Sequence, residues 1–144
     1  MDTFTTRCPS CSGINRVPTS RAAESPKCGK CQAALLDGAP VEGTDNNFNA
    51  ILNSGLPVVV DFWAPWCNPC VGFAPVFLDV ATERANQVRF VKIDTEAQQT
   101  LAAQFQIRSI PTIMVFKNGK RVDMINGALP KSQFDQWLNS ALTK

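Results

Sequence analysis

The sequence predicts an α/β protein in which a mixed central sheet is flanked by helices and a small cysteine-rich unit comes first. The apolar run 58–63 is typical of a buried strand, and helix-spaced apolar residues follow it. Strand and helix patterns then alternate, which favours parallel strands joined by right-handed crossovers. Four of the six cysteines form two Cys-x-x-Cys pairs near the start of the chain. From these observations we expect two units, residues 1–37 and 38–144.

Composition limits the classes of function. A chain of 144 residues allows a domain of about 100 residues with a small appendage. A net charge of +2, with scattered lysines and arginines, does not favour nucleic acid as a partner. No apolar run approaches about 18 residues and no leader pattern begins the chain, so we expect a cytoplasmic protein with no membrane partner. Histidine is absent, so acid–base chemistry must use carboxylates, thiols or lysine.

The first unit carries a predicted metal site. Cys8 and Cys11 are separated by sixteen residues from Cys28 and Cys31, which is the spacing of a structural zinc site with four thiolates. The unit has too few large apolar residues to fold on its own core: Met1, Phe4, Ile14, Val17, Leu35 and Leu36. Bound zinc would supply the missing stabilisation. The sequence therefore predicts a zinc ribbon with one zinc ion.

Two other interpretations of this unit remain open. The two cysteine pairs could be independent redox dithiols, although neither lies between a strand and a helix. The ribbon could also bind nucleic acid through its basic residues, but their mild clustering is more typical of a solvated face: Arg7, Arg16, Arg21, Lys27 and Lys30.

The second unit begins with a connector, residues 37–43, which merges into an edge strand around Val41. Thr44 or Asp45 is expected to cap a helix whose buried face carries three apolar residues: Phe48, Ile51 and Leu52. The central strand from Val58 follows.

The remaining two cysteines lie where that strand gives way to a helix. Apolar residues recur with helical spacing from Phe73, so Cys67 lies at the helix start and Cys70 one turn further along the same face. Their Cα atoms can approach closely enough for a disulfide to form and break. Amide groups of the first turn stabilise a thiolate at Cys67, which predicts that Cys67 attacks and Cys70 resolves. A static disulfide or half a metal site is the alternative. It is disfavoured because no second unused cysteine pair is left to complete a metal site and because Pro69 makes the helix start rigid.

These residues resemble a known family. The segments VVVDFWAPWCNPC, PVF, SIPT, VFKNG and NGALP occur in the order found in thioredoxins. With the four-cysteine segment in front, the chain resembles the bacterial thioredoxin 2 group, thioredoxins with an N-terminal zinc-binding extension. The resemblance implies the thioredoxin fold and reduction of disulfide-containing partner proteins. It also implies that an NADPH-dependent thioredoxin reductase reduces the disulfide between Cys67 and Cys70 again. That group usually has glycine at the position of Asn68, so a more oxidising disulfide oxidase or isomerase is an alternative.

Asp61 interrupts the apolar run of the central strand. Burial of its carboxyl group should raise its pKa. The resemblance implies that Asp61 accepts and returns the proton of Cys70, and that Lys92 lies close enough to moderate the pKa of Asp61. The alternatives are a carboxylate that only accepts hydrogen bonds from backbone amides, and a lysine that extends to solvent.

The second half predicts further elements in order. A strand over 88–94 has Arg89 at its exposed start, and a helix over 97–105 follows. Strands over 112–116 and 121–125 flank an Asn-Gly hairpin turn at 118–119. A terminal helix buries an apolar face: Phe134, Trp137, Leu138, Ala141 and Leu142.

The resemblance also implies a substrate groove. The bond before Pro111 would be cis, and the main chain of Ile110 would pair with an extended substrate segment. Trp66 would cover the disulfide and contact the partner, whereas Trp63 packs in the core. Further groove residues are Pro69, Gly127 and Ala128. A competing hypothesis treats the chain as a binding module, with the ribbon as the working surface and the second unit as a scaffold.

Overall fold

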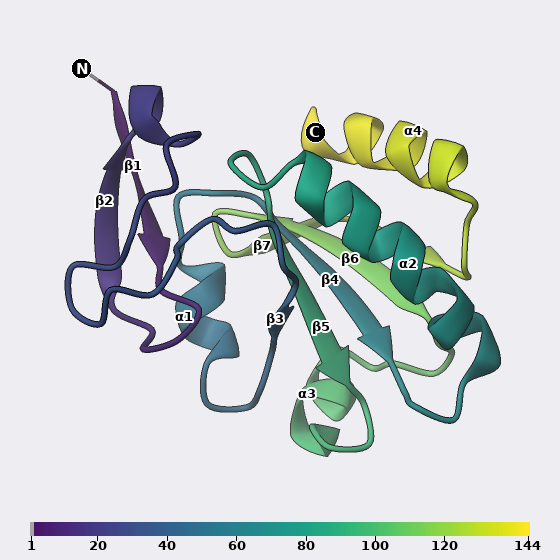
Figure 1. The fold of residues 1–144 in the computed structure, drawn as a ribbon. Coiled ribbons are helices and arrows are strands. Elements are labelled where there is room, and N and C mark those ends of the chain that lie inside the picture. Colours follow the sequence, from purple (N-terminus) through teal and green to yellow (C-terminus); the bar gives the residue numbers. More distant parts are fainter. Residues whose placement is uncertain (1) are drawn as a thin grey trace.

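The computed structural model describes residues 2–144; Met1, one of the ribbon's expected apolar residues, lies outside this range. Two separate sheets are present (Figure 1). The N-terminal sheet pairs two antiparallel strands, β1 (Thr3–Arg7) and β2 (Ile14–Pro18). A short 3-10 helix, η1 (Thr19–Arg21), follows β2, and an irregular segment then leads to β3 (Val41–Glu42).

The larger sheet confirms the predicted mixed arrangement. Its strand order is β3-β5-β4-β6-β7, with β3 at one edge. The central strands are β4 (Val58–Trp63), parallel to β5 (Arg89–Asp94) and antiparallel to β6 (Thr112–Lys117). A tight turn joins β6 to β7 (Lys120–Asn126), and Asn118 and Gly119 both have the positive φ that this turn requires, 55° and 78°.

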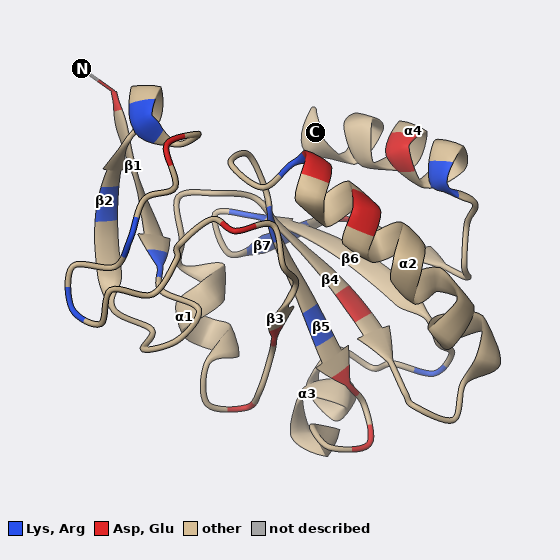
Figure 2. Cartoon of the chain, viewed as in Figure 1, with Lys and Arg blue, Asp and Glu red and all other residues tan. Residues whose placement is uncertain are grey.

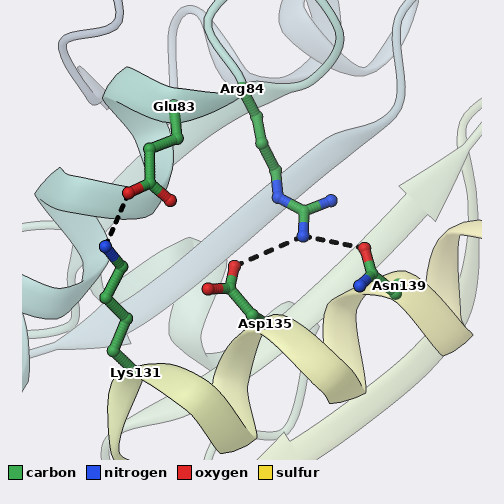
Figure 3. Close-up of polar contacts among 5 residues, drawn as sticks. All are labelled: Glu83, Arg84, Lys131, Asp135 and Asn139. Atoms are coloured by element: carbon green, nitrogen blue, oxygen red, sulfur yellow. Dashed lines mark hydrogen bonds and ion pairs between the residues drawn. The ribbon is translucent and has the colours of Figure 1, made fainter.

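Helices cover both faces of this sheet (Figure 1). On one face lie α2 (Asn68–Glu83) and α4 (Lys131–Leu142), over a core that includes Phe73, Phe77 and Phe134. On the other face lie the short helices α1 (Phe48–Leu52) and α3 (Gln99–Gln104). Figure 3 shows that polar contacts also join α2 to α4, through Lys131 to Glu83 and Arg84 to Asp135 and Asn139.

Two helices begin later than predicted. The helix expected from Thr44 or Asp45 begins at Phe48, because the Thr44 hydroxyl accepts from the N–H groups of Asn46 and Asn47 at 3.2 Å and forms a turn first. The helix expected from Ala97 begins at Gln99 after a similar turn around the Asp94 carboxylate. No helix within residues 2–144 is long and apolar enough to cross a membrane.

The prediction that Arg89 is exposed is wrong. Its relative exposure is 5%, because the ribbon packs over the start of β5. Its Nη2 donates to the carbonyl oxygen of Leu35 at 2.7 Å, to the Thr6 hydroxyl at 3.2 Å and to the carbonyl oxygen of Arg7 at 3.4 Å.

A second contact joins the ribbon to the larger sheet. Leu56, which lies just before β4, is buried in the ribbon's apolar cluster beside Val17 and Leu35. The neighbouring Gly55 donates its N–H to the carbonyl oxygen of Thr5 on β1. The ribbon is therefore docked on the larger sheet, and its apolar cluster is completed by a residue from outside the ribbon.

Candidate functional site

The two cysteines after β4 lie at the start of α2. Cys67 is the residue that caps the helix and Cys70 lies in its first turn, with their Cα atoms 5.2 Å apart and their sulfurs joined in a disulfide. The N–H of Cys70 donates to Cys67 Sγ at 3.2 Å. Cys67 is 5% exposed and Cys70 is 1% exposed. The more exposed of the two residues is therefore also the one whose sulfur receives an amide hydrogen bond.

The local sequence explains this helix start. Pro69 occupies the first turn, where its missing N–H costs no intrahelical hydrogen bond and its fixed φ suits the helix. The Cys70 N–H of that turn donates to the Cys67 sulfur, and a negative charge there is stabilised by the helix dipole. The arrangement favours a thiolate on Cys67 once the disulfide is reduced.

Asp61 is a buried carboxyl group without a hydrogen-bond partner. Its relative exposure is 0%, and neither Oδ1 nor Oδ2 is hydrogen-bonded within residues 2–144. Burial raises the pKa of Asp61 to about 7, and the positive charge of Lys92 opposes this rise only in part. The alternative in which backbone amides hold the carboxylate does not fit, because no amide reaches it. Asp61 and Val59 point to the same face of β4, which is the face covered by α2.

Lys92 is directly opposite Asp61 in the parallel pairing of β4 with β5. Its side chain is half-buried, and Nζ lies 4.3 Å from the ring centroid of Trp63. This distance is within the range of a cation–π contact. The indole of Trp63, which is itself half-buried, therefore holds the ammonium group beside the strand rather than leaving it free in solvent.

A second loop faces the cysteines. The Ile110–Pro111 peptide bond is cis, as the resemblance implied. Ile110 packs against the cysteine pair, and its carbonyl oxygen lies 3.8 Å from Cys67 Sγ. The N–H of Gly127 donates to the Pro111 carbonyl oxygen at 2.8 Å, which brings the loop after β7 to the same edge. Ala128 follows in this loop and is exposed.

Beside the disulfide is an open hollow of about 430 Å³, lined by residues of the turn after β4 and of two further loops: Trp66, Thr95, Ile107, Arg108, Ser109 and Ile110. Trp66 is 64% exposed, and its indole N–H donates to Glu96 Oε1 at 2.6 Å. Sequence reasoning identified Trp66 and Ile110 but missed Glu96 and Arg108. Their charges are unremarkable in the sequence, and only the fold brings them to the site.

The other four cysteines form a second cluster of sulfur atoms. Within residues 2–144, the Sγ atoms of Cys8, Cys11, Cys28 and Cys31 all lie within 4.8 Å of one another. Cys8 Sγ is 3.6 Å from Cys31 Sγ, and Cys11 Sγ is 3.6 Å from Cys28 Sγ. Four sulfurs at about 2.3 Å around a tetrahedral zinc ion would be about 3.8 Å apart. The cluster therefore has the size and the ligands that zinc requires.

Donors surround the sulfurs of this cluster. The N–H groups of Ser10 and Cys11 point to Cys8 Sγ at 3.3 and 3.4 Å. The side-chain amide of Asn15 and the N–H of Lys30 donate to Cys28 Sγ at 3.5 and 3.4 Å. The Asn15 amide, followed by backbone N–H groups, lowers the pKa of Cys28 to about 6. Such donors favour the thiolate form in which cysteine binds metal. Sequence reasoning missed Asn15, which lies outside the spacing motif.

Two family models match successive parts of the chain. The family model described as Thioredoxin matches residues 39–140, and the one described as Thioredoxin 2, N-terminal, matches residues 7–33. The chain is 46% identical over 136 residues to Thioredoxin C-3 of Corynebacterium nephridii, covering 94% of this chain and 93% of that protein.

Two other relatives match a smaller share of the chain. The chain is 48% identical over 101 residues to Thioredoxin of Porphyra purpurea, covering 69% of this chain and 94% of that protein. It is 45% identical over 105 residues to Thioredoxin 1 of a Nostoc species, covering 72% of this chain and 98% of that protein.

Proposed function

The chain belongs to the thioredoxin family and is a thiol-disulfide oxidoreductase, and on that premise we propose the roles of its individual residues. The Cys67 thiolate attacks one sulfur of a disulfide in a partner protein. A bond forms between Cys67 and that sulfur, the partner's disulfide breaks, and the other partner cysteine leaves as a thiolate. The amide hydrogen bond to Cys67 and its place at the helix start support this role.

In the second step the Cys70 thiolate attacks Cys67 Sγ. The mixed disulfide breaks, the partner leaves as a dithiol, and Cys67 and Cys70 are joined again. Asp61 takes the proton of Cys70 before this attack. The observation that carries the assignment is a buried carboxyl group with no hydrogen-bond partner and a pKa of about 7, which suits proton transfer near neutral pH. Lys92 keeps that pKa from rising further.

The partner protein binds along the exposed edge of this site. We assign substrate contacts to Trp66, Pro69, Ile110, Gly127 and Ala128, with Pro111 holding the loop that faces Cys67. An extended segment of the partner would pair with the main chain of Ile110, as in strand addition. The exposure of Trp66 and the hollow beside it support this placement.

The ribbon binds one zinc ion through its four cysteines. Four protein thiolates leave no open position for water or substrate, so the ion is structural and stabilises residues 1–37 as a unit distinct from residues 38–144. A regulatory role is the alternative, because Cys11 and Cys31 are exposed and could be oxidised.

We assign the protein to the cytoplasm, with disulfide-containing proteins as its substrates and an NADPH-dependent thioredoxin reductase as its electron source. Nucleic acid and membranes are not expected partners, and the small net charge of +2 supports the first of these expectations.

The test compares Cys67→Ser and Cys70→Ser with the wild type in reduction of a protein disulfide. Both variants should lose turnover, because each removes one sulfur of the cycle. Only Cys70→Ser should accumulate a covalent complex with the partner, which a non-reducing gel detects. A stable complex formed by Cys67→Ser instead would reverse the two roles. Wild-type protein with no turnover, although folded and zinc-loaded, would favour the binding-module hypothesis.

A further inference from the structure

A second hollow, remote from the cysteine pair, lies on the ribbon. Its volume is about 280 Å³, and we call it the ribbon groove. The residues that line it include Arg16, Val17, Arg21, Glu24, Lys27 and Leu35. The lining includes four consecutive residues, 15–18, of β2. Alternate residues of a strand point to opposite faces, so a hollow that contacts consecutive residues runs along the edge of the strand. The ribbon groove is therefore bounded on one side by the edge of β2.

Within residues 2–144, that edge has main-chain groups with no hydrogen-bond partner. The N–H of Cys8 donates to the Gly13 carbonyl oxygen and the N–H of Thr19 donates to that of Asp2, so these pairs belong to the hydrogen-bonded set of the β1–β2 ladder. Hydrogen-bonded and non-hydrogen-bonded pairs alternate in antiparallel strands. The pair Thr5 and Arg16 is therefore non-hydrogen-bonded, and the N–H and C=O of Arg16 point away from β1. An extended chain can add at such an edge.

The ribbon groove is positively charged. Arg16, Arg21 and Lys27 are all exposed, and within residues 2–144 none of them forms an ion pair with a carboxylate. Figure 2 shows basic positions on β2, on η1 and on the segment that follows. Glu24 also lines the groove, which leaves an excess of two positive charges there.

The floor of the groove is apolar. Val17 and Leu35 are 3% and 1% exposed and belong to the ribbon's buried cluster, and the half-buried Pro26 forms part of the wall. A polypeptide with an apolar side chain between acidic ones matches this combination. A nucleic acid matches it less well, because it has no extended main chain of alternating N–H and C=O groups that could pair with a strand edge.

We propose that the ribbon groove binds an extended acidic segment of a partner protein. The segment adds as a third strand beside β2 through the main chain of Arg16, and its carboxylates pair with Arg16, Arg21 and Lys27. This contact is independent of disulfide chemistry. When the partner protein also carries a disulfide, the contact of its acidic segment with the ribbon groove is a second attachment point. This contact lowers the KM for reduction of that partner without changing kcat.

The test uses the full-length, zinc-loaded protein and a fluorescent peptide of alternating glutamate and valine with no cysteine. Fluorescence anisotropy should show saturable binding that weakens as salt rises. The double variant Arg16→Glu with Arg21→Glu should weaken binding at least about tenfold. The control double variant, Lys120→Glu with Arg121→Glu, changes net charge equally at exposed positions of β7 and should bind within about twofold of the wild type.

Two further measurements address the mode of binding. The amide N–H of Arg16 should gain protection from hydrogen exchange when the peptide is bound, because the added strand accepts its hydrogen bond. A glutamine–valine peptide should bind at least about tenfold more weakly than the glutamate–valine peptide. No saturable binding at low salt, equal losses in both double variants, or tighter binding of single-stranded DNA than of the peptide would each overturn the proposal. The peptide contains no disulfide, so this outcome does not depend on the catalytic residues.

Discussion

The β4–β5 strand pair buries two charged side chains, Asp61 and Arg89, and their surroundings are opposite in kind. Asp61 on β4 is 0% exposed and neither of its oxygens has a hydrogen-bond partner within residues 2–144. Arg89 at the start of β5 is 5% exposed, and its Nη2 donates to three oxygen atoms of the ribbon. Burying a charge costs several kcal/mol unless partners replace the lost water. Only Arg89 has such partners.

Arg89 has the contacts of a structural buried charge, whereas Asp61 has the burial and the missing partners expected of the proton acceptor proposed above. The hydrogen bonds of Arg89 hold the ribbon against the sheet, so its desolvation is offset by contacts between the two units. The desolvation of Asp61 is offset only in part, by the charge of Lys92, and it raises the pKa of Asp61 to about 7. A carboxyl group in that state is costly for stability and well suited to exchanging a proton with a thiol.

Replacing Asp61 should produce the largest effect on stability. Its folded pKa of about 7 lies above its ordinary value of 3.8, so the native state retains a proton that the unfolded chain releases between about pH 4 and pH 7. Stability therefore falls as pH rises through that window and is level above it. Asp61→Asn should raise the free energy of unfolding by about 4 kcal/mol at pH 8 and by little at pH 4.

Urea unfolding of the oxidised protein at pH 4 and pH 8 measures this difference. Asp79→Asn is the matched control, because it removes an exposed carboxylate of α2. The control should change stability by less than about 0.5 kcal/mol at either pH. A gain for Asp61→Asn that is equal at both pH values would contradict a raised pKa at Asp61.

The same variant should slow resolution of the mixed disulfide by about a hundredfold at pH 7, since the asparagine amide cannot accept the proton of Cys70. Rapid-quench measurement of partner release, from pH 5 to pH 9, isolates this step from the first attack. In the wild type the rate should rise through about pH 7, and in Asp61→Asn that rise should disappear. An unchanged profile in the variant would assign the proton transfer to another group or to water.

Arg89→Met tests the other half of the comparison. Methionine fills similar space but leaves the Thr6 hydroxyl and the carbonyl oxygens of Arg7 and Leu35 without this donor. We expect a loss of about 3 kcal/mol in the free energy of unfolding. The control is Arg84→Met, which removes a partly exposed contact to Asp135 and should cost about 1 kcal/mol or less (Figure 3). Equal costs in the two variants would mean that the buried contacts of Arg89 stabilise the fold no more than the partly exposed contact of Arg84 does.

Gly55→Ala should weaken the docking of the ribbon without touching Arg89. A Cβ atom at this position would lie 2.7 Å from the Thr5 carbonyl oxygen and 2.9 Å from its nitrogen, so β1 must move away. We expect a cost of about 1 to 2 kcal/mol, with faster hydrogen exchange in β1. Gly72→Ala is the control, because a Cβ there meets nothing within 4 Å and alanine favours the helix. Slower exchange in β1 of Gly55→Ala would contradict this packing.

The sequence could identify one of these buried charges but not the other. Asp61 can be identified from the sequence because it interrupts an apolar run. The run forms the buried strand β4, so the residue that interrupts it is buried as well. Arg89 was expected to be exposed, because an arginine at a strand end usually is. Its burial depends on a separate unit that docks through residues far away in the chain, such as Leu35 and Thr6. Glu96 and Asn15 were missed because each contacts a residue that is distant in the chain, Trp66 and Cys28 respectively.

The smallest expected effect concerns the link between Asp61 and Lys92. The charge of Lys92 lowers the pKa of Asp61, so Lys92→Met should raise that pKa above about 7. The pH profile of mixed-disulfide resolution should then move to higher pH, and the free energy of unfolding should fall above pH 7 but not below pH 4. Lys120→Met, at an exposed position of β7, is the control and should leave the profile in place. A profile that stays unchanged in Lys92→Met would mean that the contact with Trp63 keeps the ammonium group from acting on Asp61. The raised pKa would then depend on burial alone.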